Sequence, residues 1–140
     1  MTDRYAADDL IAYAQALFTA AGLDADKAAI VAPLMVEADL MGHTTHGLQL
    51  VPPYLAALAD GSMAGSGQPE ALADRGPVVS WDGRRLSGVW LTATAVDLAV
   101  ERARQYGTCR VDPARPSHCL PGGVPGARHP PRHDGADRQL

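Results

Sequence analysis

The stretch that decides the fold is VEADLMGHTTHGLQLVPPYLAALADGSM, residues 36–63. It begins as the end of an apolar-striped helix that Gly42 should stop, and the adjacent prolines Pro52 and Pro53 suit the first turn of the next helix. Between the two helices lies GHTTHG, residues 42–47, which holds two imidazoles and two hydroxyls. A polar link held by rigid helices is a frequent place for substrate-binding groups.

On these residues alone, the GHTTHG segment has three interpretations. His43 and His46 could hydrogen-bond a carboxylate or carbonyl oxygen of a substrate. The same histidines could share a zinc ion, but before residue 110 the chain adds only Cys109 as a further His or Cys ligand, so we expect no metal site. Thr44 or Thr45 could instead serve only as the N-cap of the following helix.

The first sixty residues predict three short helices. Apolar residues recur every three or four positions from about Asp8 to Ala21, and Asp8 or Asp9 is expected to cap that helix. The second helix begins after Asp24, and Pro33 should kink or split it because proline removes an internal hydrogen bond. Its expected inner face consists of Ile30, Val31, Leu34, Ala38 and Met41.

A strand and a long helix are expected after the small-residue loop 62–67. PVVSWDG predicts a short strand from Val78 to Trp81, closed by an Asp-Gly turn. An amphipathic helix follows from about Val89 to Tyr106, and Gly107 should end it. Three short helices, a strand and a long helix indicate an α/β chain, in which a further strand should return to the sheet.

The residues from 109 to 140 have a different composition. From Arg110 onward the chain holds six prolines, four glycines, five arginines and three histidines, but no Ile, Phe, Tyr, Trp or Met. This composition favours neither a strand nor a packed helix, and it is typical of a disordered basic tail. A second hypothesis is that a GC-rich gene is read out of frame after about residue 108. We therefore divide the chain into an N-terminal domain portion, 1–108, and a tail, 109–140.

Composition excludes several classes of function. The formal net charge of −4 argues against a nucleic-acid surface. No run reaches the roughly 20 apolar residues needed to span a bilayer, and the acidic start MTDRYAADDL does not resemble a signal peptide. Two cysteines are too few for a disulfide framework. We expect a cytoplasmic protein that binds neither nucleic acid nor membrane.

The run from Val36 to Met63 closely resembles the segment VEADLRGHDSHGL..LPRYV..L..G of the malate/L-lactate dehydrogenase family. These type-2 NAD(P)-dependent 2-hydroxyacid dehydrogenases include ureidoglycolate and sulfolactate dehydrogenases. VVSWDGRRLSGVWLTATAVDLAVERARQYGT, residues 78–108, is similar to a less specific family pattern of small residues. The resemblance covers about residues 5–108.

The resemblance implies an α/β fold with a mixed sheet and flanking helices, unrelated to the Rossmann fold. It implies hydride transfer between NAD or NADP and a small-molecule 2-hydroxyacid or 2-oxoacid, in a homodimer. Thr45 and His46 match the family's Ser-His pair near substrate and nicotinamide, and Gly47 matches the glycine that follows. Family members exceed 300 residues, so the resemblance implies a truncated chain whose own activity is in question.

Two positions depart from the family pattern. Many members have a carboxylate-gripping arginine where this chain has Leu50, so the bidentate partner of a simple 2-hydroxyacid is missing. The family's general acid/base histidine falls near His118 by count, but the flanking residues do not match. Because a base needs a fixed geometry, the role is not carried over to His118 and the catalytic residues stay unassigned.

The alternative to a dehydrogenase is a small helical interaction module with a flexible basic tail. It keeps the helices of the first hundred residues and has no catalytic function. An evolved module of this kind should be monodisperse, whereas a fragment of a larger domain should expose apolar helix faces.

Overall fold

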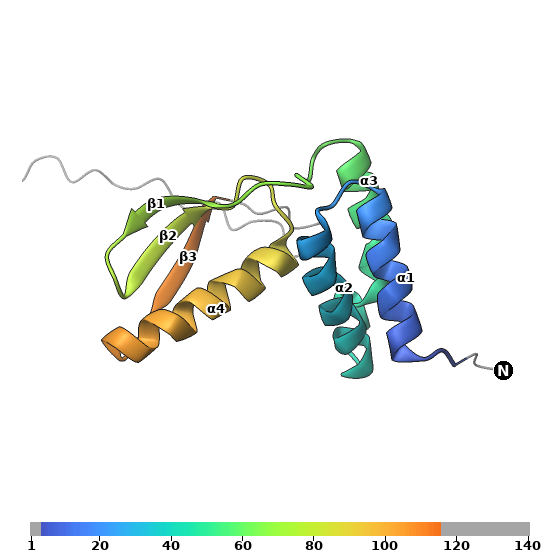
Figure 1. The fold of residues 1–140 in the computed structure, drawn as a ribbon, viewed down its shortest axis with the longest axis horizontal. Coiled ribbons are helices and arrows are strands. Elements are labelled where there is room, and N and C mark those ends of the chain that lie inside the picture. The colour runs from blue at the N-terminus through green and yellow to red at the C-terminus, as the bar shows by residue number, and fades with distance from the viewer. Residues whose placement is uncertain (1–3, 116–140) are drawn as a thin grey trace, which may run out of the picture.

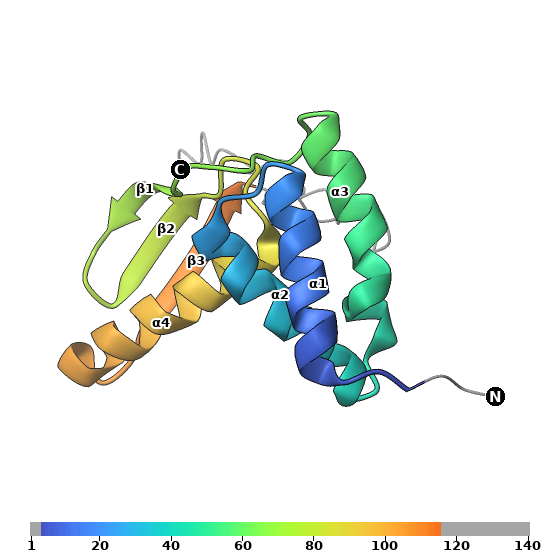
Figure 2. The same cartoon turned by 45° about the vertical axis from the view of Figure 1, so that its right-hand side comes forward.

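The computed structural model describes residues 4–115 of the chain. Helices α1 to α3 stand together on one side, and a three-stranded sheet with α4 against one face forms the other side (Figure 1). Figure 2 shows the same division. In chain order the elements are α1 (Ala7–Ala20), α2 (Ala25–Leu40), the 3-10 turns η1 (Thr44–His46) and η2 (Leu48–Leu50), α3 (Val51–Ala59), β1 (Glu70–Asp74), β2 (Val78–Asp82), α4 (Gly88–Tyr106) and β3 (Arg110–Arg115).

Glycines in the left-handed backbone region follow the four α-helices. Gly22, Gly42, Gly61 and Gly107 have φ values of 96°, 80°, 74° and 80°. L-residues with a side chain rarely adopt this region, so glycine stops each helix at little cost. The ends predicted at Gly42 and Gly107 are confirmed. The predicted start of α1 is wrong in detail, because its N-cap is Ala6 and no side chain caps it.

Helix α2 is continuous through Pro33, so the expected split does not occur. The assigned inner face is also partly wrong, because Leu34 is 38% and Met41 61% exposed. Alanine and valine lie on several sides of this helix, and spacing alone does not select one stripe among them. The residues that α2 buries are Lys27, Ala28, Val31, Ala32, Met35, Val36 and Ala38.

The sheet has the strand order β1-β2-β3 and is mixed. Strand β2 pairs antiparallel with β1 and parallel with β3. Helix α4 connects the parallel pair, as a crossover between parallel strands requires. The α/β class is confirmed, and β2 was predicted almost at its observed bounds. The sequence did not predict β1, whose five residues, EALAD, are all exposed.

The expectation that a further strand returns to the sheet after α4 is confirmed, whereas the composition-based expectation that no strand forms after Arg110 is wrong. Residues Arg110–Arg115 form β3 and pair in parallel with β2 over Val78 to Asp82. Composition misled here because backbone pairing, rather than side-chain propensity, supports a short edge strand. The remainder of the proposed tail, 116–140, lies outside the described residues, so the division at residue 108 stays a prediction.

The hydrophobic core lies among the helices rather than under the sheet. Phe18 of α1 is fully buried and its ring stands 6.1 Å from that of Tyr54 in α3. Trp90 and Leu91 from the first turn of α4 enter the same cluster, as does Met63 from the loop after α3. The start of α4 therefore anchors the sheet to the helical layer. Within residues 4–115, no helix is long and apolar enough to cross a membrane.

Lys27, the only lysine of the chain, is buried where α2 meets α4. Its ammonium lies 2.9 Å from the Asp24 carboxylate and 3.8 Å from that of Asp26. The same nitrogen stands 4.7 Å from the centre of the Trp90 ring, within range of a cation–π interaction. Lys27 therefore fixes the approach of α4 to the helical layer.

Candidate functional site

The GHTTHG segment connects α2 to α3 through two consecutive 3-10 turns. Residues 43 to 46 are all exposed, whereas Gly47 is buried. The second turn, η2, runs directly into α3, and Val51 already has helical backbone angles. The sequence-predicted position between two helices is therefore confirmed, and it presents four polar side chains to solvent.

Thr45 and His46 form a hydrogen-bonded pair. The Thr45 hydroxyl lies 3.0 Å from Nδ1 of His46, and which atom donates depends on the imidazole tautomer. This contact leaves Nε2 to meet a ligand, where it could donate to a carboxylate or accept from a hydroxyl. The pair has the chemistry to bind a polar oxygen. The interpretation that Thr44 or Thr45 caps the following helix is wrong, because the N-cap of α3 is Leu50 and no side chain caps η1, η2 or α3.

The ends of the segment are tied to the last turn of α2. The His43 amide donates to the Ala38 carbonyl at 2.8 Å. The carboxylate of Asp39 accepts the Leu48 amide at 2.8 Å, nine residues along the chain. Gly47 lies directly on that carboxyl, and a Cβ there would overlap it. Sequence reasoning missed Asp39, although its place in VEADLMG before the segment could have suggested a capping role.

Leu50, the residue at the position of the family's arginine, does not face solvent freely. Its side chain is partly buried and packs against the core cluster. The neighbouring Gln49 is exposed and carries an amide instead of a charge. The described part of the segment therefore offers imidazole, hydroxyl and amide groups to a ligand, without a guanidinium.

No group of three or more His, Cys, Asp or Glu residues lies together among residues 4–115 in a way that could hold a metal ion. His43 and His46 thus have no third protein ligand in that range. His118 falls outside the described residues.

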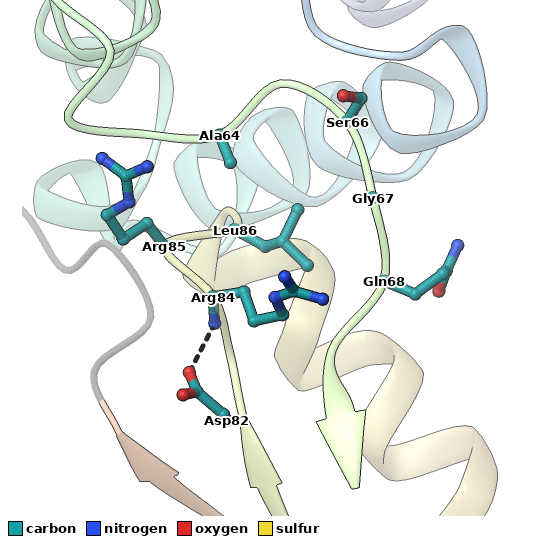
Figure 3. A pocket seen from close by; sticks show the side chains of 8 residues that line it. All are labelled: Ala64, Ser66, Gly67, Gln68, Asp82, Arg84, Arg85 and Leu86. Carbon is teal, nitrogen blue, oxygen red and sulfur yellow. Dashed lines mark hydrogen bonds between the residues drawn. The ribbon is translucent and has the colours of Figure 1, made fainter.

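A separate hollow of about 630 Å³ lies between the loop after α3 and the turn after β2 (Figure 3). Arg84 and Arg85 have φ values of 50° and 62° in this turn, which Leu86 closes by donating its amide to Gly83. Figure 3 shows the two arginine side chains pointing to different sides. Arg85 donates to the Gly61 carbonyl. The hollow therefore lacks a converging set of polar groups and is a poorer candidate than the Thr45–His46 pair.

The chain has the fold of a known class of α/β dehydrogenases. Over 78% of its length it superposes on malate dehydrogenase from Pyrococcus horikoshii OT3 with a TM-score of 0.75 and 25% identity, covering 31% of that chain. A dehydrogenase from Sinorhizobium meliloti gives a TM-score of 0.71 at 28% identity, over 78% of this chain and 32% of that one. The predicted combination of a mixed sheet and flanking helices is thereby confirmed.

The family model for malate/L-lactate dehydrogenase matches residues 5–128, and the chain belongs to this family. It is 33% identical over 105 residues to an L-lactate dehydrogenase from Cupriavidus necator, which is 75% of this chain and 30% of that protein. It is 30% identical over 108 residues to hydroxycarboxylate dehydrogenase B of Escherichia coli K12, which is 77% of this chain. The chain spans about 30% of the length of these relatives. The match does not favour the stand-alone interaction module.

Proposed function

We propose that this chain carries the substrate-side portion of an oxidoreductase that transfers hydride between NAD or NADP and a small 2-hydroxyacid or 2-oxoacid. One observation supports this most directly: the family match includes the segment whose Thr45 and His46 form an exposed hydrogen-bonded pair between two fixed helices. Relatives with hydroxycarboxylate and L-lactate dehydrogenase names agree with this substrate class.

The Thr45–His46 pair fits either the substrate or the nicotinamide end of the cofactor. A hydroxyl and an imidazole can together donate to and accept from a carboxamide or a carboxylate. When bound, NAD(P) supplies or accepts the hydride, and the protein supplies orientation and charge placement. In the proposed role, Thr45 holds the His46 ring through Nδ1, so that Nε2 is oriented toward a substrate oxygen. Gly47 keeps the backbone after the pair free of a side chain.

The site binds a carboxylate without the arginine of many relatives. Neutral donors hold a carboxylate less tightly than a bidentate guanidinium does. We therefore expect weak affinity for simple 2-oxoacids and a preference for substrates that also offer other polar groups to Gln49 or His46.

We propose a cytoplasmic homodimer in the full-length family form. The resemblance implies that most residues that contact the cofactor in this family lie later in the chain than residue 108. The 140-residue chain by itself should therefore bind NAD(P) weakly and have little or no hydride-transfer activity.

Substrate binding can be tested without turnover. Equilibrium dialysis of the purified chain with labelled pyruvate or oxaloacetate should show binding that His46→Ala weakens about tenfold or more, as expected when a group that meets the ligand is removed. His43→Ala is the matched control, because His43 is also exposed in the same link but lies outside the Thr-His pair. Equal affinities for the two variants, or absence of binding to the wild-type chain, would overturn the proposal.

A further inference from the structure

The segment with Thr45 and His46 has little structure of its own. Residues 43 to 46 bury none of their side chains, and η1 is a single 3-10 turn. Such a turn is marginal in isolation because few hydrogen bonds offset the lost chain entropy. Something outside η1 must therefore hold the pair in one position.

Asp39 supplies a side-chain contact that reaches across the segment. It stands in the last turn of α2, is half-buried, and accepts the amide of Leu48 at 2.8 Å. Leu48 is the first residue of the helical run that continues into α3, so the carboxylate also meets the positive end of that run. A charge-assisted bond at this place joins the end of one helix to the start of the next.

Gly47 completes the contact by leaving room for the carboxyl. The three atoms that would lie nearest to a Cβ at Gly47 are Oδ1, Cγ and Oδ2 of Asp39, all at overlapping distances. The φ of Gly47 is −92°, so the left-handed region does not explain the glycine. Close approach to Asp39 does explain it. The N-terminal end of the segment also bonds to α2, because the carbonyl of Ala38, the residue before Asp39, accepts the His43 amide.

We propose that Asp39 is a positioning residue for the Thr45–His46 pair, acting through the Leu48 amide and the space at Gly47. The inference rests on the proposed function for its consequence in binding, but its structural part stands on the contacts alone. With both ends of the segment tied to one turn of α2, Asp39 reduces the freedom of His46 before a substrate arrives. Preorganisation of this kind improves affinity by lowering the ordering cost.

The structural part is tested by hydrogen exchange of the whole chain. Asp39→Ala should raise the exchange rate of the Leu48 amide about tenfold or more, because a charge-assisted bond is lost. Glu37→Ala is the matched control: it removes the same charge from the same helix turn, and Glu37 is exposed. Asp39→Asn keeps an acceptor oxygen and should restore most of the protection. Equal Leu48 exchange in wild type and Asp39→Ala would overturn the inference.

A double-mutant cycle tests the role of Gly47. Gly47→Ala should accelerate exchange at residues 44 to 48 in the wild-type chain, but much less in the Asp39→Ala chain, where the overlapping carboxyl is gone. Strict additivity would contradict direct contact between the two positions.

Pyruvate affinity links the inference to function. Asp39→Ala should weaken pyruvate binding about fivefold while Asp39→Asn stays within about twofold of wild type. If Asp39→Ala raises Leu48 exchange as predicted but the wild-type chain binds no 2-oxoacid, the proposed function is refuted and the positioning role still holds. Oxoacid binding that is unaffected in Asp39→Ala would refute the positioning role and leave the proposed function standing.

Discussion

The buried Lys27 allows a quantitative prediction about what joins the helical layer to α4. The side chain is 1% exposed, whereas its partner Asp24 is 41% exposed. Lys27→Ala removes the three packed stem carbons beyond Cβ together with the ammonium, which should cost about 3 kcal/mol, as for buried leucine or methionine. Lys27→Met keeps most of the stem and loses only the ammonium. The Asp24 carboxylate, which is part-exposed, can then be hydrated by solvent in place of its lost partner.

The charge of Lys27 should therefore matter less than its packing. The part-exposed ion pair contributes about 1 kcal/mol or less, and the cation–π contact with Trp90 about 1–2 kcal/mol. In Lys27→Met the desolvation penalty of the buried ammonium is removed as well, and this gain offsets much of the free energy lost with the two contacts. We expect Lys27→Met to lie within about 1 kcal/mol of wild type. Asp24→Asn should be more destabilising than Lys27→Met, because it leaves a buried cation with weaker compensation.

Urea unfolding, followed by circular dichroism and tryptophan fluorescence, measures these differences. The expected order of stability is wild type, Lys27→Met, Asp24→Asn and Lys27→Ala. If Lys27→Met were as destabilising as Lys27→Ala, the ammonium rather than the stem would hold α4, and the reasoning from packing would be refuted.

Three further predictions concern the core, the hairpin and the site. Phe18→Ala should lower the free energy of unfolding by about 4 kcal/mol, because it empties a fully buried site; a loss under about 1 kcal/mol in urea unfolding would contradict the core assignment. The Gly76 amide and the Arg102 guanidinium hold the pKa of Asp74 below its usual 3.8, so this carboxylate stabilises the fold above that pH and the stabilisation is lost as pH falls through the lowered pKa. Asp74→Asn should accordingly reduce the loss of unfolding free energy at acid pH. An unchanged acid dependence would show that the contacts of Asp74 with Gly76 and Arg102 do not stabilise the fold. Leu50→Arg should raise pyruvate affinity about fivefold in equilibrium dialysis, since the arginine stem can pack on the core while its guanidinium reaches solvent. Unchanged affinity would show that position 50 does not contact the substrate.

The helices were predictable because their ends depend on local backbone chemistry. Gly22, Gly42, Gly61 and Gly107 take positive φ values that other residues avoid, so the sequence itself specifies where the helices stop. The buried face of α2 was not predictable, since alanine lies on several sides and the buried Lys27 has the polarity of a surface residue.

The strands that were missed depend on partners rather than on their own residues. Strand β1, EALAD, has no β-branched residue and none of its five residues is buried, so only its pairing with β2 identifies it. Strand β3 contains a proline and two arginines and is likewise defined by its parallel pairing with β2. Pairing between segments far apart in the chain is not visible in local propensity.

The candidate site was predictable in position but not in its support. The stop at Gly42 and the prolines at the start of the next helix placed Thr45, His46 and Gly47 in a link between helices, and the structure confirms that link. The resemblance to the family proposed their role near the substrate. The contact of Asp39 with Leu48 spans nine residues and requires the folded geometry, which a sequence pattern does not give.

The most direct test of the central claim is a map of amide chemical shifts while the chain is titrated with pyruvate. The account predicts the largest changes at residues 44 to 48, with His46 among them and the His46→Ala variant unresponsive. Changes centred instead on Arg84 and Arg85, beside the hollow in Figure 3, would contradict it. They would show that the acid binds there through surface charge rather than at the Thr45–His46 pair.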